Sequence, residues 1–197
     1  NDTLYLQLDQ NIEVTTPHVY LQDIAALSMS DPKILTAYTG RLLELYRDTG
    51  CQRLVLLGDL LYHGPRNPLP EGYEPPAVAK MLNDMADELL CVRGNCDAEV
   101  DQMVLHFPIL SDSALLVLDG LTIHATHGHI HALRQEDILL CGHFHVPVRR
   151  DCGRYTYLNP GSVALPKENS PHSCMVLEGG QFTWLDVVTG QPFQPRG

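Results

Sequence analysis

The stretch ILLCGHFH, residues 138–145, runs from an apolar segment straight into two histidines. The apolar part has the length and composition of a buried strand, and His143 and His145 follow it two residues apart. Side chains two apart at the end of a strand project from the same rim of a sheet. Upstream, His127 and His129 follow another apolar run in the same way. Because neutral imidazole is a common ligand of transition metals, the two clusters predict a metal site at the rim of a sheet.

Two more predicted strands end in polar side chains. Leu54–Leu57 is apolar throughout, as expected of a strand buried on both faces of a parallel sheet, and Gly58-Asp59 follows it. Leu89–Val92 leads in the same way to Gly94-Asn95-Cys96-Asp97. A helix pattern opened by Pro75-Pro76 separates the two strands. This order predicts an open α/β arrangement with a site at the carboxyl edge of the sheet.

The remaining elements are predicted from turn and helix signals. Asp119-Gly120 joins two apolar runs and is a strong signal for a two-residue hairpin turn. Gly179-Gly180 separates a last pair of runs in the same way. Arg41–Asp48 places its apolar side chains on one face, and Gly50 closes this predicted helix.

The composition excludes several classes of function. A chain of 197 residues that is 44% hydrophobic fits one domain with a substantial core. The net charge of −11 argues against nucleic-acid binding, although a metal ion can still attract a phosphate locally. No segment resembles a transmembrane span or a signal peptide, and the six cysteines include no CxxC pair. We therefore expect a cytoplasmic protein that does not bind membranes, either as a monomer or as a homo-oligomer.

The polar groups occur in a characteristic order: Gly58-Asp59, Gly94-Asn95-Cys96-Asp97, His127-Gly128-His129 and Gly142-His143-Phe144-His145. A carboxylate, an amide oxygen and imidazoles suit Mn, Fe or Zn better than Ca. This order resembles the calcineurin-like metallophosphoesterases, and closely the small bacterial YfcE-like phosphodiesterases, over about residues 40–190. The resemblance implies an α/β fold, a two-sheet sandwich flanked by helices, with two metal ions that are usually Mn²⁺.

The resemblance also implies a role for each residue. Asp59 would bridge the metals, Asn95, His127 and His143 would complete one site, and His145 would serve the other. The catalytic residues would be Asn95, Cys96 and His127. Relatives often carry a histidine at the position of Cys96 to assist the leaving group. A thiol is a poorer proton donor, so Cys96 either favours aryl leaving groups or is a packed, inert thiol.

Several other polar residues have two interpretations. Arg66 either contacts a substrate phosphate or is structural, and His129 lines the site without binding metal. His124 is either a satisfied polar residue or a partner that orients a ligand. Asp97 caps a helix or orients a ligand, and Asn159 belongs to a turn.

The chain departs from the family at its start. The family opens with a strand that ends in Asp-x-His, and no such motif precedes Asp59. Residues 1–36 stand there instead as an atypical N-terminal segment, followed by a metallophosphoesterase-like domain at 37–197, within a single domain overall. The metal site served by His145 then lacks most of its ligands. The protein therefore binds either two metal ions, as the family does, or one. If this segment packs where the missing strand belongs, Asp9 or Asp23 would approach the vacant metal site, although neither has the family's spacing.

A second departure is the short connection at residues 130–136. A parallel crossover with its helix takes at least about 10–12 residues. This connection is shorter, and it lies beside the predicted site.

Three functions follow from these features. The first is a metal-dependent phosphodiesterase that hydrolyses a small phosphodiester by attack of a metal-activated hydroxide, impaired by loss of the first ligand motif. The second is a non-catalytic scaffold that keeps the fold for protein binding, as the retromer subunit of this superfamily does. The third is a hydrolase with one metal, held by Asn95, His127 and His143.

Overall fold

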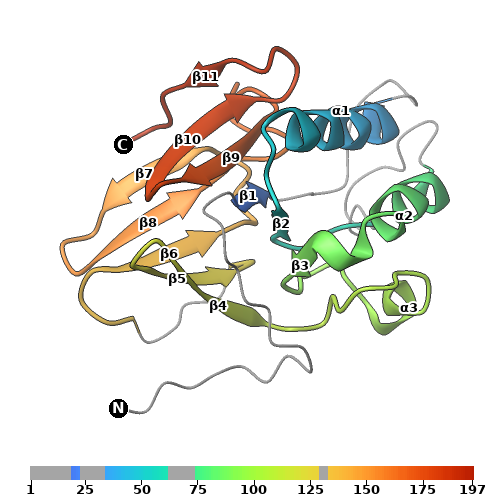
Figure 1. The fold of residues 1–197 in the computed structure, drawn as a ribbon, viewed down its shortest axis with the longest axis horizontal. Helices are drawn as coiled ribbons and strands as arrows, with labels where there is room; N and C mark the ends of the chain where they lie inside the picture. The colour runs from blue at the N-terminus through green and yellow to red at the C-terminus, as the bar shows by residue number, and fades with distance from the viewer. Residues whose placement is uncertain (1–18, 23–33, 62–73, 129–132) are drawn as a thin grey trace.

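The structure, a computed structural model, describes residues 19–22, 34–61, 74–128 and 133–197 (Figure 1). The described residues do not include four that the sequence analysis named: Asp9, Asp23, Arg66 and His129. The elements in chain order are β1 (Val19–Gln22), α1 (Ile34–Asp48), β2 (Arg53–Leu56), α2 (Pro75–Asn83), a 3-10 turn (Ala86–Glu88), β3 (Leu89–Cys91), α3 (Glu99–Gln102), β4 (Ser113–Leu118), β5 (Leu121–Thr126), β6 (Asp137–Cys141), β7 (Val148–Asp151), β8 (Tyr155–Asn159), β9 (Ser173–Glu178), β10 (Gln181–Asp186) and β11 (Pro192–Phe193).

The strands form two sheets. One has the order β11-β10-β9-β1-β2-β3 and the other β4-β5-β6-β8-β7. Figure 1 shows the helices beside the first sheet and the second sheet on the far side of it. The predicted two-sheet sandwich with flanking helices is confirmed.

The alternation of side chains along β2 explains this layering. Leu54 and Leu56 are fully buried in the core that β2 shares with α1 and α2. Val55 and Leu57 point the other way, into the core that contains residues of β5, β6 and β8. Because successive side chains of a strand face opposite sides, an apolar run is required to bury both faces. The first sheet is therefore the central layer.

β1 gives part of the N-terminal segment a place in this central sheet. It pairs in parallel with β2, with Gln22 level with Leu56, and antiparallel with β9. Its carboxyl end thus lies at the same edge of the sheet as Asp59.

The predicted turns are largely confirmed. Asp119 and Gly120 both have positive φ angles, 51° and 77°, as the two-residue turn between β4 and β5 requires. β5 and β6 are parallel, as expected, although their connection is short. Some boundaries differ: α1 begins at Ile34 rather than Arg41, and β2 and β3 end one residue earlier than predicted, at Leu56 and Cys91.

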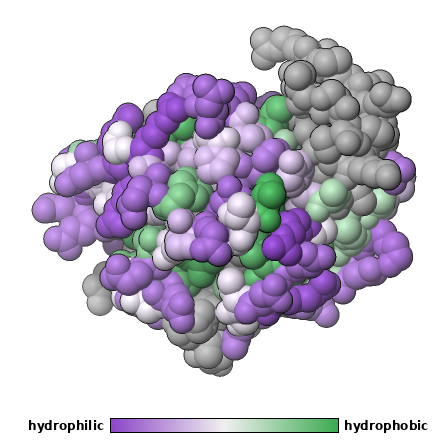
Figure 2. All heavy atoms as spheres, turned by 90° about the horizontal axis from the view of Figure 1, so that it is seen from above, coloured by the Kyte–Doolittle hydropathy of each residue, from purple (hydrophilic) through white to green (hydrophobic). Residues whose placement is uncertain are grey.

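The surface is consistent with the acidic composition. Figure 2 shows one face of the molecule as mainly hydrophilic, with apolar side chains in small separate patches. Among the described residues, no helix combines the length and hydrophobicity that crossing a bilayer requires.

Candidate metal centre

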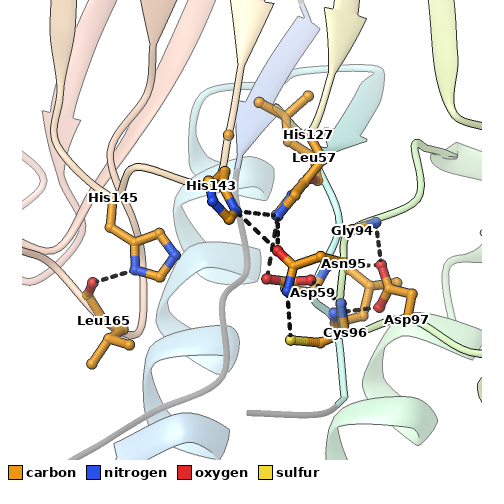
Figure 3. Close-up of polar contacts among 12 residues, drawn as sticks. Leu57, Asp59, Gly94, Asn95, Cys96, Asp97, His127, His143, His145 and Leu165 are labelled. Atoms are coloured by element: carbon orange, nitrogen blue, oxygen red, sulfur yellow. Dashed lines mark hydrogen bonds and ion pairs between the residues drawn. The ribbon is translucent and has the colours of Figure 1, made fainter. Parts of the chain in front are cut away.

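Four predicted ligands come together where their strands end (Figure 3). Nε2 of His127 lies 3.0 Å from Oδ1 of Asn95 and 3.3 Å from Oδ2 of Asp59. Nδ1 of His143 lies 2.9 Å from the same Asn95 oxygen and 3.1 Å from Nε2 of His127. Asp59 and His127 are buried, whereas Asn95 and His143 are exposed. The cluster therefore has a buried base and a side open to solvent.

The hydrogen bond to Leu57 determines the chemistry of His127. Its Nδ1 lies 2.5 Å from the carbonyl oxygen of Leu57, which can only accept, so Nδ1 carries the proton. In the neutral ring Nε2 is then an acceptor, and it faces two oxygens of Asn95 and Asp59 that are acceptors as well. A proton on Nε2 would satisfy one such contact, whereas a cation between the atoms satisfies all of them.

The spacing of these atoms fits a metal shell. An octahedral shell with metal–ligand distances of about 2.1 Å places neighbouring ligand atoms about 3.0 Å apart. The four contacts, 2.9 to 3.3 Å, are close to this value. Within the described part of the chain, no group of three His, Cys, Asp or Glu side chains is placed to hold a metal by itself. The cluster instead includes the amide oxygen of Asn95, which contacts both imidazoles.

The backbone of the candidate ligands is unusual. Asp59, His143 and His145 have φ angles of 58°, 64° and 61°, in the left-handed region that side chains other than glycine rarely adopt. Asp, Asn and His tolerate this region better than most residues. Such strain persists where the surrounding structure fixes it, which is common at functional sites.

The match to known families agrees with this geometry. The profile of the calcineurin-like phosphoesterase superfamily domain matches residues 29–180. The chain belongs to the calcineurin-like phosphoesterase superfamily. It is similar to the phosphodiesterase YfcE of Escherichia coli K12, with 49% identity over 146 residues, which are 71% of this chain and 79% of that protein.

Solved structures of the superfamily give the same picture. The structure of E. coli YfcE, described as a phosphoesterase, has a TM-score of 0.81 and 39% identity, and covers 90% of this chain and 97% of its own. The zinc complex of Entamoeba histolytica Vps29 has a TM-score of 0.56 and 21% identity, and covers 89% and 96%. The second likeness concerns the fold alone.

Burial and neighbouring charges change the pKa values of Asp59 and Cys96. Burial favours a higher pKa for Asp59, but the N–H of Cys96, together with the hydrogen bond and charge that His127 supplies when its Nε2 is protonated, holds the pKa below its ordinary value. Asp59 is thus a carboxylate at neutral pH. Burial and the nearby charge of Asp59 raise the pKa of the Cys96 thiol to about 12, so that thiol is neutral.

Asp97 orients the cluster instead of capping a helix. Its Oδ2 accepts hydrogen bonds from the N–H groups of Asp59, at 2.8 Å, and Gly94, at 2.7 Å. Its Oδ1 accepts from the N–H of Leu60 at 2.8 Å. The Asp97 side chain thus links the segments that follow β2 and β3. No pattern in the sequence predicts these hydrogen bonds.

His145 lies apart from the four atoms (Figure 3). Its Nδ1 donates to the carbonyl oxygen of Leu165 at 2.9 Å, and burial lowers its pKa to about 4. The ring is therefore neutral, with Nε2 as an acceptor. Asp59 and His145 are the described residues that the resemblance assigns to the second metal, and His145 lies apart from the four-residue cluster.

Two further residues have structural contacts. Nε2 of His124 lies 2.9 Å from Oδ2 of Asp137, outside the cluster. Asn159 donates from Nδ2 to the carbonyl oxygen of Gly142 at 2.9 Å, which supports the turn that presents His143.

Two glycines allow the strand ends to approach. A Cβ on Gly94 would lie 2.2 Å from Oδ1 and 2.3 Å from the backbone nitrogen of Asp59, and one on Gly58 would lie 2.3 Å from the nitrogen of Gly94. Real Cβ atoms do not come this close, so a side chain at position 94 would displace Asp59, and one at position 58 would displace the backbone of Gly94.

Gly94→Ala is expected to lower the free energy of unfolding by about 3 kcal/mol, because the added methyl group overpacks this contact. It should also lower the Mn²⁺ content, since Asp59 moves. Denaturant unfolding and elemental analysis measure the two effects. Gly40→Ala is the control, because a Cβ there meets nothing within 4 Å. Normal stability and metal content in Gly94→Ala would contradict the account.

Proposed function

We propose that this chain is a metal-dependent phosphodiesterase and that its reaction takes place on the open side of the cluster. The observation that carries the proposal is the convergence of Asp59, Asn95 and His127 as acceptors around one point. A cation between these atoms satisfies all of their contacts at once, whereas a proton on Nε2 of His127 satisfies one. A phosphate is a natural ligand of such a cation on an acidic protein.

The four side chains of the cluster would serve as the metal ligands. Asp59, Asn95, His127 and His143 would hold a divalent cation, for which we propose Mn²⁺. When bound, the ion supplies positive charge to the phosphate and lowers the pKa of a water molecule toward neutrality. Leu57 fixes His127 in the tautomer that offers Nε2 as a ligand. The exposure of Asn95 and His143 leaves room for the substrate.

Two finer points follow. We propose one ion in the described cluster, with a second ion only where residues other than Asp59 and His145 complete its shell. We also propose that the protein works in the cytoplasm, as a monomer or a homo-oligomer. Its six cysteines, all described residues, form no disulfide, which suits a reducing compartment.

The scaffold alternative has less support. A scaffold that binds another protein would be supported by a large exposed apolar patch away from the metal cluster. Among the described residues, the exposed apolar side chains that lie close together in sequence are Val100, Met103 and Val104. Val100 and Val104 line a groove that Cys96 also lines, so this surface adjoins the cluster.

The test is hydrolysis of bis(4-nitrophenyl) phosphate by the full chain supplied with Mn²⁺. The proposal expects turnover that chelation removes and Mn²⁺ restores. Asn95→Ala should remove it, because the cluster loses the oxygen nearest both imidazoles. No turnover with any divalent ion would overturn the proposal.

Cys96→Ser is expected to change the turnover number less than about tenfold. The thiol is neutral and a weak hydrogen-bond donor, so it stabilises a departing oxygen little. Cys152→Ser, at an exposed cysteine, is the control. A thousandfold loss in Cys96→Ser alone would show that the thiol is an essential acid.

A further inference from the structure

A groove adjoins the cluster on the side of α2 and α3. Its volume is about 880 Å³, and residues of both helices and Cys96 line it. The lining is largely apolar, with Leu61, Pro76, Ala79, Ala98, Val100 and Val104. A groove of this size accommodates an aromatic group.

Cys96 connects the groove to the candidate ligands. Its N–H donates to Oδ1 of Asp59 at 2.8 Å, and its sulfur accepts from Nδ2 of Asn95 at 3.2 Å. The same residue lines the groove. The groove therefore begins at a residue that contacts two of the candidate ligands.

The edge of the groove exposes apolar side chains beside charges that are already paired. Val100 is 64% exposed and Val104 is 50% exposed, although both are large and apolar. At the same edge Lys80 and Asp84 form an ion pair at 2.6 Å. Covering the valines with an apolar group would be favourable, because it removes exposed apolar area from water.

The chemistry of Cys96 agrees with an aromatic occupant. In the hydrolysis, hydroxide from water bonds to phosphorus, the bond from phosphorus to the ester oxygen breaks, and that oxygen leaves with the electron pair. A thiol is a weak donor and assists this oxygen little. An aryl oxide delocalises the charge in its own ring and takes its proton from solvent afterwards.

We propose that the groove between α2 and α3 is the leaving-group subsite, and that it selects phosphodiesters with a bulky aromatic leaving group. The inference rests on the proposed function. Val100 and Val104 are its specificity-determining residues, because they line the groove from outside the metal cluster.

The experiment compares methyl 2-naphthyl phosphate with methyl phenyl phosphate, whose leaving groups have similar acidity but different apolar area. The full chain supplied with Mn²⁺ should show kcat/KM about tenfold higher for the naphthyl ester. Val100→Asp should remove most of this preference. Val117→Asp is the matched control, since Val117 is 66% exposed and lies in β4.

The outcomes separate the two proposals. A preference that Val100→Asp removes and Val117→Asp keeps supports the subsite. Hydrolysis of both esters with no preference, or an equal preference in both variants, overturns the subsite and leaves the phosphodiesterase standing. If the chain hydrolyses neither ester, the subsite proposal fails, and turnover of bis(4-nitrophenyl) phosphate decides separately whether the phosphodiesterase stands.

Discussion

Asp59→Asn is expected to lower the turnover of an aryl phosphodiester about a thousandfold while the protein stays folded. The amide keeps the shape of the side chain and an acceptor for the N–H of Cys96, and asparagine tolerates the φ angle of 58°. The substitution removes the negative charge of the Asp59 carboxylate from the cluster. If that charge contributes about 4 kcal/mol through the metal, the loss is about a thousandfold.

The measurement is steady-state hydrolysis of bis(4-nitrophenyl) phosphate with saturating Mn²⁺, together with circular dichroism. Asp119→Asn is the matched control, because Asp119 also has a positive φ, 51°, but is exposed in the hairpin turn. Turnover in Asp59→Asn within tenfold of the parent would place the reaction elsewhere.

Asp97→Ala is expected to destabilise the protein by about 4 kcal/mol. The change leaves the N–H groups of Asp59, Leu60 and Gly94 without their acceptor, and Asp97 is 3% exposed. Each unsatisfied buried group costs about 1–3 kcal/mol. For a chain of 197 residues this lowers the melting temperature by about 10 °C.

Thermal unfolding measures the effect. The control is Asp151→Ala, because Oδ1 of Asp151 accepts one N–H, that of Gly153 at 2.7 Å, at an exposed turn. Its removal should cost less than about 1 kcal/mol, since water replaces the carboxylate. Equal losses in the two variants would mean that Asp97 has no special part in joining the strand ends.

Patterns of apolar residues predict the central elements well. The uninterrupted run Leu54–Leu57 requires burial on two faces, and the structure provides it with a helix layer and a second sheet. Asp119-Gly120 similarly specifies its hairpin, because few other residue pairs adopt two positive φ angles. Asp59 and Asn95 follow strands of one sheet, and His127 and His143 follow strands of the other. The sequence therefore predicts each pair at the edge of a sheet, and the packing of the two sheets brings the pairs together.

Elements with weak local signals are the ones that sequence reasoning misses. β7 (Val148–Asp151) is mostly polar and exposed at the edge of its sheet, so it lacks an alternating pattern. α3 and β11 are too short for any periodicity. α1 extends back to Ile34 through Thr36, Thr39 and Gly40, which are poor helix formers, so helix propensity gives no signal for its start.

The details of the site depend on contacts between distant residues. The tautomer of His127 is set by Leu57, 70 residues earlier, and the position of Asp59 by Asp97, 38 residues later. Neither bond has a sequence signal. The ligand types are therefore predictable, whereas their orientation requires the structure.

The most direct test of the central claim, a cation site made by Asp59, Asn95, His127 and His143, is the Mn²⁺ content per chain. The full chain is loaded with Mn²⁺, desalted and analysed for metal beside His143→Ala, which removes a ligand on the exposed side. The account predicts at least one ion per parent chain and one ion fewer in the variant. A parent chain without metal, or a variant with unchanged content, would contradict it.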